Sequence, residues 1–138
     1  MIYMLDTNIC IYIINKHPTN YYQKLDLLEK TNDLVISSIV LAELQYGVAN
    51  SKHKEQNQIK VNTLISRLEI LDFSAKCAVY YGELRAELKQ KGTIIGNNDL
   101  LIASHALCQQ AILVTNNCLE FQRVPNLIVE NWGISTSI

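Results

Sequence analysis

The sequence predicts an α/β fold in which a mostly parallel sheet is covered on both faces by helices. Short apolar runs that end abruptly in polar residues alternate with longer stretches of helical periodicity. No repeat, low-complexity segment or Pro/Gly-rich linker interrupts the 138 residues, and this length is typical of one domain. We therefore expect a single domain over residues 1–138.

Five apolar runs have the length and composition of strands that are buried on both faces. They cover residues 2–5, 34–36, 68–71, 111–114 and 127–129. In a parallel sheet the carboxyl ends of the strands lie at one edge, and ligands of such folds bind there. Candidate functional residues are therefore expected directly after these runs.

Four helices are predicted between these strands, over residues 38–50, 54–66, 74–91 and 98–109. Ser38 is a candidate N-cap of the first helix, and Ser74 is one for the third, which Gly92 can end. The third helix also has an apolar stripe on one face, formed by Cys77, Tyr81, Leu84 and Leu88. The spacing predicts that this stripe packs into the core.

The composition excludes several classes of protein. With 12 Lys and Arg against 13 Asp and Glu, the net charge is −1, so nucleic acid would have to bind through a local basic patch. The four cysteines have no metal-binding spacing, which indicates reduced thiols. No apolar run reaches the ~18 residues that cross a membrane, and Asp6 interrupts any signal peptide. We expect a cytoplasmic protein without membrane contact.

Three acidic residues occupy notable places relative to these elements. Asp6 directly follows the first strand, and Asp99 lies in the first turn of the last helix. Each has an ordinary structural explanation, which is capping for Asp6 and interaction with the helix dipole for Asp99. Glu43 lies in residues 39–48, which are apolar nearly all round and are expected to be buried. A buried glutamate must be neutral, paired with a base or bound to a metal.

A fourth polar group follows the run 111–114. Thr115 and Asn117 supply a hydroxyl and an amide, and Glu120 either reaches the same place or is a solvated helix residue. Charges ~4 Å apart repel by ~4 kcal/mol at an effective dielectric constant of ~20, so converging carboxylates need a cation. Mg²⁺ and Mn²⁺ prefer oxygen ligands and assist phosphodiester hydrolysis by activating water. The acids therefore predict metal-dependent phosphodiester cleavage.

Four motifs, in order along the chain, resemble the PIN-domain family and, within it, the VapC toxins of VapBC toxin–antitoxin pairs. They are Met4-Leu5-Asp6-Thr7-Asn8; Ser37-Ser38 with Ala42-Glu43-Leu44 and Tyr46-Gly47; Ile95-Gly96-Asn97-Asn98-Asp99 with Ile102-Ala103; and Leu113-Val114-Thr115-Asn116-Asn117 with Glu120-Phe121 and Val124-Pro125. The resemblance implies a three-layer α/β/α sandwich with a five-stranded parallel sheet. It also implies a Mg²⁺- or Mn²⁺-dependent endoribonuclease toxin that cuts initiator tRNA in the anticodon region and inhibits translation.

The same resemblance implies roles for individual residues. Asp6 and Asp99 would hold the metal, while Glu43, together with Glu120, would complete the acidic site and activate metal-bound water. Thr115 and Asn117 would orient the site. Asn117 stands where many PIN domains have an aspartate, and this leaves fewer anionic ligands for a second metal.

Partners are also implied by the resemblance. They are a cognate VapB-type antitoxin, a second copy of the toxin in a homodimer, an RNA substrate, and operator DNA that is contacted only through the antitoxin. The apolar stretches 39–48 and 59–68 are candidate docking surfaces, or simply core. Arg85 and Lys89, one turn apart on the helix 74–91, are candidate RNA contacts, or simply solvated.

Two alternatives remain open from the sequence. A receiver-like signalling domain also has acids at strand ends, but it needs an acidic pair after the first strand and a lysine after the last, and residues 124–138 contain no lysine. A PIN-like module that binds RNA or a partner without cleaving would have the same fold, although the intact Asp6, Glu43 and Asp99 argue against it. His105 is expected to be structural because it does not share a helix face with Asp99.

Overall fold

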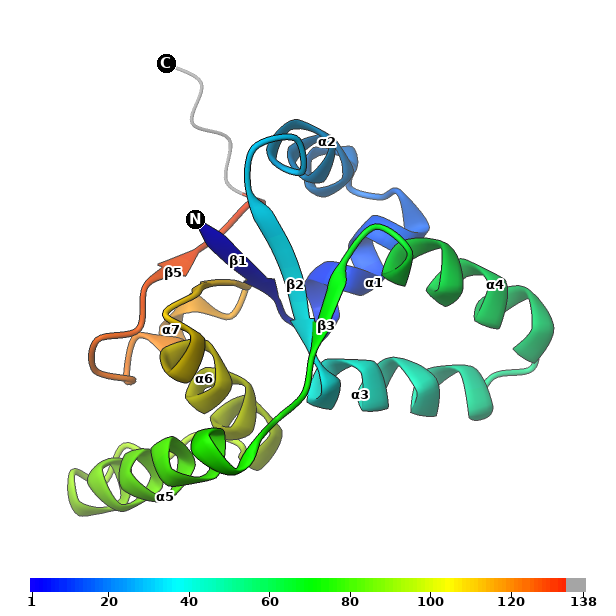
Figure 1. Ribbon diagram of the computed structural model, residues 1–138. Coiled ribbons are helices and arrows are strands. Elements are labelled where there is room, and N and C mark those ends of the chain that lie inside the picture. The colour runs from blue at the N-terminus through cyan, green and yellow to red at the C-terminus, as the bar shows by residue number, and fades with distance from the viewer. Residues whose placement is uncertain (134–138) are drawn as a thin grey trace.

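The computed structural model describes residues 1–133, and strands and helices alternate in it as predicted. The elements are β1 (Ile2–Leu5), α1 (Thr7–Asn15), α2 (Thr19–Leu28), β2 (Asp33–Ser37), α3 (Ser38–Ala49), α4 (Lys54–Ile65), β3 (Glu69–Leu71), α5 (Ala75–Gln90), α6 (Asn97–Gln109), β4 (Ile112–Val114), α7 (Cys118–Phe121) and β5 (Val129–Glu130). The strands form one five-stranded sheet in the order β3-β2-β1-β4-β5, and every pairing is parallel (Figure 1). The predicted fold class is therefore confirmed.

Helices cover both faces of the sheet. Figure 1 shows α1, α2 and α4 on one side of the strands, and α5 and α6 on the other. The topology explains this division, because crossovers between parallel strands are right-handed. The chain moves outward from β1 to β3 and then returns across the sheet to β4, so the helices of the second half lie on the opposite face. The result is a three-layer α/β/α sandwich.

The order in which the chain adds strands to the sheet reverses between β1 and β4. Leu5 pairs with Val114, and the N–H of Asp6 donates to the Val114 carbonyl at 3.0 Å. Asp6 and Thr115 therefore follow two neighbouring strands at the carboxyl edge of the sheet, at the place where open α/β folds bind ligands. The strand order also excludes the receiver-like alternative, since that fold has the order 2-1-3-4-5.

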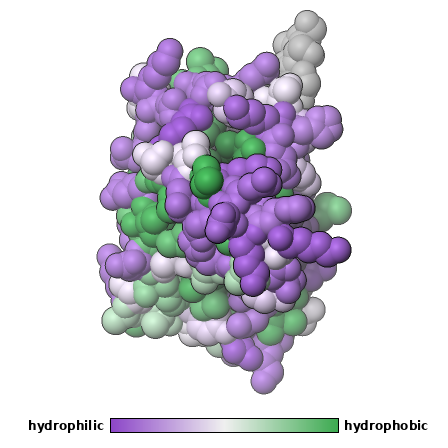
Figure 2. Space-filling model, turned by 90° about the vertical axis from the view of Figure 1, so that its right-hand side faces the viewer, coloured by the Kyte–Doolittle hydropathy of each residue, from purple (hydrophilic) through white to green (hydrophobic). Residues whose placement is uncertain are grey.

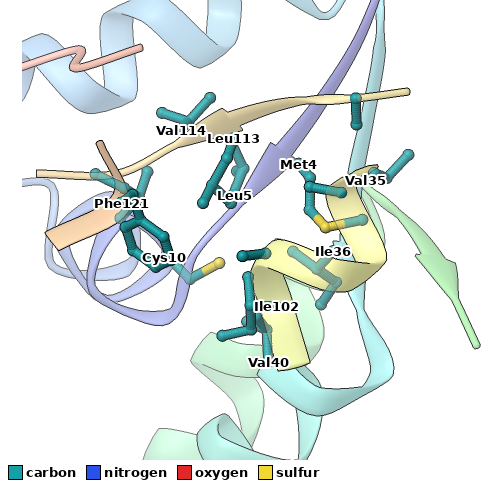
Figure 3. Close-up of a cluster of buried hydrophobic side chains, with 14 of the residues drawn as sticks. Met4, Leu5, Cys10, Val35, Ile36, Val40, Ile102, Leu113, Val114 and Phe121 are labelled. Atoms are coloured by element: carbon teal, nitrogen blue, oxygen red, sulfur yellow. The ribbon is translucent and has the colours of Figure 1, made fainter. Parts of the chain in front are cut away.

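The core is centred on the two middle strands. Met4, Leu5, Leu113 and Val114 are fully buried (Figure 3). Surrounding helices add Cys10, Val40, Ile102 and Phe121 to the same cluster (Figure 3). Burial on both faces of the sheet explains why these strands appear in the sequence as continuous apolar runs. Within residues 1–133, no helix combines the length and the apolar character that a membrane span requires.

Several local predictions differ from the structure. Ser37, not Ser38, caps α3: its hydroxyl accepts the Ile39 N–H at 3.1 Å, whereas the Ser38 hydroxyl accepts the Phe73 N–H at 3.0 Å. The last strand is Val129–Glu130, two residues later than the predicted start. The helices Thr7–Asn15 and Thr19–Leu28 are not among the four predicted ones; the polar sequence of the second contributes only two buried side chains.

The prediction for α5 is confirmed in its main features. Ser74 caps the helix, and Gly92 follows it with a positive φ of 68°. Cys77, Leu84 and Leu88 are buried as expected, whereas Tyr81 is only half-buried. The four cysteines are free thiols.

Candidate active site

Asp6 is placed by the end of β1 and the start of α1. Its carboxylate caps α1 by accepting the Ile9 N–H at 3.1 Å, and only 6% of the residue is exposed. Burial raises the pKa of Asp6 and the charge of Glu43 raises it further, while hydrogen bonds from Thr115 and the Ile9 amide act in the opposite direction. Capping and a place in an acidic site are therefore compatible at this position.

Glu43 reaches the same region from α3. The Thr7 hydroxyl donates to its Oε1 at 3.0 Å, which links α3 to the first turn of α1. The prediction that this helix is buried on all sides is wrong: Tyr46 is 68% exposed, and Glu43 itself is half-buried. Only the face of Val40, Leu44 and Val48 packs into the core, so the acid lies at the border between core and solvent.

Asp99 shows most directly that the acids converge. It lies in the first turn of α6, half-buried, and its pKa is raised from 3.8 to about 6. Burial is the main cause, followed by the negative charges of Glu120, Asp6 and Glu43. Carboxylates from four separate elements thus act on one another at the carboxyl edge of the sheet.

Glu120 is held by two donors. The Gly96 N–H donates to its Oε1 at 2.9 Å, and the Asn117 side-chain amide donates to its Oε2 at 2.5 Å. The Gly96 amide is the main reason why the pKa of Glu120 is lowered, while burial raises it. Asp99 and Glu120 therefore have pKa values displaced in opposite directions, so Asp99 takes up a proton at a higher pH than Glu120 does.

Thr115 and Asn117 lie next to these acids. Thr115 is fully buried, and its hydroxyl accepts the Asn117 N–H at 3.0 Å. The turn that this bond closes directs the Asn117 amide to Glu120. Asn117 therefore positions a carboxylate and adds no negative charge of its own.

The donor atoms of the site are carboxylate, hydroxyl and amide oxygens, which fit a hard divalent cation. Gly96 borders the site, because a Cβ added there would lie in van der Waals contact with two of the acids, 3.7 Å from Glu120 Oε1 and 3.8 Å from Asp99 Oδ2. Within residues 1–133, no three His, Cys, Asp or Glu side chains converge closely enough to hold a metal alone. Water or substrate oxygens would complete the coordination, as is usual for Mg²⁺.

The remaining predicted residues lie outside this acidic group. His105 is fully buried, with Nδ1 2.8 Å from the Ser37 hydroxyl, so the structural role expected for it agrees with its place in the core. Arg85 and Lys89 are exposed on α5. Sequence reasoning missed Thr7 and Gly96, which bind Glu43 and Glu120; their only signal was their position beside Asp6 and at the start of α6.

Comparison with known proteins assigns the family. The family model of the PIN domain matches residues 3–127, nearly the whole chain. The chain belongs to the PIN-domain family. Within the family it is similar to VapC proteins: it is 72% identical over 132 residues to Ribonuclease VapC2 of Rickettsia felis, covering 96% of this chain and 98% of that protein. It is also 43% identical to the tRNA(fMet)-specific endonuclease VapC of Salmonella typhimurium, covering 94% and 97%.

Solved structures agree with this assignment of the PIN domain. A crystal structure of VapBC2 from Rickettsia felis, bound to a DNA fragment from their promoter, superposes with a TM-score of 0.91 and 70% identity, covering 96% of this chain and 99% of that one. DNA-bound VapBC from Salmonella typhimurium superposes with a TM-score of 0.89 and 42% identity, covering 96% and 98%.

Proposed function

We propose that this PIN domain is the ribonuclease toxin of a VapBC pair, that it cuts RNA with the help of Mg²⁺ or Mn²⁺, and that it thereby inhibits translation in the cytoplasm. The observation that carries the proposal is the grouping of Asp6, Glu43, Asp99 and Glu120 at the carboxyl edge of the sheet, where the strand order reverses. There the charges of neighbouring carboxylates raise the pKa values of Asp6 and Asp99. Similarity to the tRNA(fMet)-specific endonuclease favours initiator tRNA, in its anticodon region, as the substrate.

We propose a different catalytic role for each acidic residue, according to the groups that surround it. Asp6 and Asp99 would hold the metal ion, which, when bound, lowers the pKa of water and offsets negative charge on the phosphate. Glu43, fixed by Thr7, would orient the attacking water and accept its proton. Glu120 is kept charged by the Gly96 amide and Asn117, and with Thr115 these groups would fix the geometry of the site.

Removal of metal gives the first test. We expect the purified chain to cut initiator tRNA with Mg²⁺, to lose this activity in EDTA, and to regain it when Mg²⁺ or Mn²⁺ is added back. Gel electrophoresis and sequencing of the new RNA ends measure both the rate and the position of cleavage. A chain that binds the tRNA but leaves it intact with either ion would instead be a non-cleaving PIN module, and the proposal would be wrong.

The position of Gly96 beside the acids gives a second prediction. A methyl group in Gly96→Ala would contact the carboxylates of Asp99 and Glu120 without a clash. Its backbone, with φ −56° and ψ 148°, suits alanine, so we expect the melting temperature to stay the same or rise slightly. We expect Mn²⁺ affinity, measured by calorimetry, to fall severalfold.

Gly82→Ala is the matched control, because an added Cβ meets nothing within 4 Å there. Both variants gain the same methyl group, but only Gly96→Ala places it at the acids. Equal Mn²⁺ affinity in the two variants would show that the ion does not occupy the space beside Gly96.

The surface formed by α1, α3 and α4 is a candidate docking site for an antitoxin that inhibits the enzyme. Figure 2 shows hydrophobic patches among hydrophilic side chains on the side of the molecule where α3 and α4 lie in Figure 1. Ile11 of α1, Tyr46 of α3 and Ile59 of α4 are 41%, 68% and 65% exposed. Between these helices, a cavity of about 250 Å³ is lined in part by Glu43, Gly47 and Val61. We propose that a VapB-type antitoxin docks in this groove and reaches the acidic site past Glu43. The solved VapBC complexes, both bound to DNA, support an antitoxin as the partner. We propose in addition a toxin homodimer and operator DNA that is contacted only through the antitoxin.

A further inference from the structure

Two arginines are linked by hydrogen bonds to the segment that leads into α6, next to the acidic site. The loop, residues 94–96, precedes α6 and supplies the Gly96 N–H to Glu120. Arg123 Nη1 donates to the Ile94 carbonyl at 3.2 Å. Arg85 is linked to Asn97, the first residue of α6, through the Tyr81 hydroxyl. Arg123 is near enough to Glu120 to lower its pKa, and Asn97 lies two residues before Asp99.

The link between Arg85 and Asn97 is a chain of two hydrogen bonds. Arg85 Nη1 donates to the Tyr81 hydroxyl at 2.9 Å, and that hydroxyl donates to Asn97 Oδ1 at 2.7 Å. The guanidinium carbon also lies 6.0 Å from the centre of the Tyr81 ring. These contacts explain why Tyr81 is half-buried. Its ring packs against the hydrophobic core, while its hydroxyl accepts a hydrogen bond from an exposed arginine.

Both arginines retain most of their hydrogen-bonding capacity. A guanidinium has five N–H donors in a planar fork that matches phosphate oxygens. Within residues 1–133, salt bridges involve only Arg67 and Lys91, so neither Arg85 nor Arg123 is neutralised by a carboxylate at that range. Arg123 is also one of the influences, after the Gly96 amide, that lower the pKa of Glu120.

A cluster of acids repels RNA, and a chain with net charge −1 has no general attraction to offset this. We propose that Arg85, positioned by Tyr81, and Arg123, positioned by the Ile94 carbonyl, form a clamp that binds two RNA phosphates next to the acidic site. The inference rests on the proposed ribonuclease function and deepens it. It adds Arg123 to the residues that engage the substrate, and it makes Tyr81 and Asn97 positioning residues for Arg85.

The clamp is tested by the salt dependence of RNA binding. The probe is a fluorescein-labelled anticodon stem–loop of initiator tRNA, and the parent protein is Asp99→Asn in EDTA, so that no cleavage occurs and one acidic charge is removed. Anisotropy gives Kd between 50 and 300 mM KCl. Each phosphate contact to single-stranded RNA contributes about 0.7 to the slope of log K against log salt. We expect Arg85→Gln and Arg123→Gln each to lower the slope by about 0.7 and to weaken binding about tenfold.

Two further variants separate the clamp from general effects. Lys30→Gln removes an exposed cation in the turn before β2, at the opposite edge of the sheet, and we expect an unchanged slope. Tyr81→Phe keeps every charge and removes only the hydroxyl, so we expect binding to weaken severalfold while the slope stays the same. Cleavage kinetics of the otherwise wild-type chain should show the matching rise in KM for Arg85→Gln and Arg123→Gln.

The outcomes distinguish the clamp from the proposed function. If the wild-type chain cuts RNA but the Arg85 and Arg123 variants keep the parental slope, the clamp is wrong and the ribonuclease proposal stands. If the two variants resemble Lys30→Gln in slope and lose only antitoxin binding, the arginines serve the protein partner, and the clamp is again wrong. A wild-type chain that neither binds nor cuts RNA overturns both proposals.

Discussion

Asp99→Asn is expected to abolish RNA cleavage, with a loss of at least about 100-fold, while the protein keeps or gains stability. The substitution removes one of the two proposed metal ligands, and it also removes a negative charge that Glu120, Asp6 and Glu43 disfavour. One pKa unit corresponds to ~1.4 kcal/mol, and because Asp99 is partly exposed we expect solvent screening to leave a gain of about 1–2 kcal/mol at pH 7. Cleavage assays and urea unfolding measure the two effects separately.

The pH dependence of unfolding gives the same prediction a sharper form. The pKa of Asp99 is about 6 in the folded protein and near 3.8 when unfolded, so between these values the folded state binds more protons. In metal-free protein, the stability that this group contributes is complete below pH ~4 and is lost as the pH rises through about 6. Asp99→Asn should remove this part of the decline.

Asp33→Asn is the matched control for this experiment. Asp33 is exposed at the start of β2, at the opposite edge of the sheet. We expect it to leave both the cleavage rate and the decline in stability between pH 4 and 6 unchanged. An Asp99→Asn protein that cuts RNA at the wild-type rate with Mg²⁺ would show that Asp99 has no role in catalysis.

Glu43→Gln is expected to lower kcat by about 100-fold or more, the range that a general base contributes. Glutamine keeps a side-chain oxygen that can accept the Thr7 hydroxyl, so the link between α3 and α1 should survive. The half-buried position predicts a stability change within about 0.5 kcal/mol. Single-turnover cleavage assays with saturating Mg²⁺ measure the chemical step directly.

Glu69→Gln controls for the loss of one negative charge, because Glu69 is exposed on the edge strand β3. We expect this control to cleave like the wild type. If Glu43→Gln and Glu69→Gln have the same kcat, Glu43 does not activate the attacking water, and another group must accept the proton.

Much of the fold was predictable from local patterns. The strand runs around Met4 and Leu113 are continuous and apolar because they are buried on both faces, and this burial leaves a clear signal in the sequence. The helix Thr19–Leu28 left no such signal, since Tyr21 and Leu25 alone anchor it. The exposed face of α3 was predicted to be core, because the sequence alone does not distinguish an apolar residue that packs into the core from one, such as Tyr46, that lies on the surface.

The site was predictable in its acids but not in the contacts that hold them. Asp6, Glu43 and Asp99 could be found because each stands at a strand end or in an apolar setting. The bonds from Thr7 to Glu43 and from Gly96 to Glu120 join residues far apart in the chain, and only the packing of the helices brings these pairs together. The same holds for the bond from Tyr81 to Asn97, which left Tyr81 indistinguishable from a core residue.

Calorimetric titration of metal-free protein with Mn²⁺ tests the convergence of the acids most directly. Asparagine caps helices as well as aspartate does, so Asp6→Asn should fold normally. We expect the wild type and Asp33→Asn to bind Mn²⁺ equally, Asp6→Asn and Asp99→Asn each to weaken binding by about tenfold or more, and the double variant to be little worse than either single one. Wild-type affinity in both single variants would contradict a shared metal site at Asp6 and Asp99.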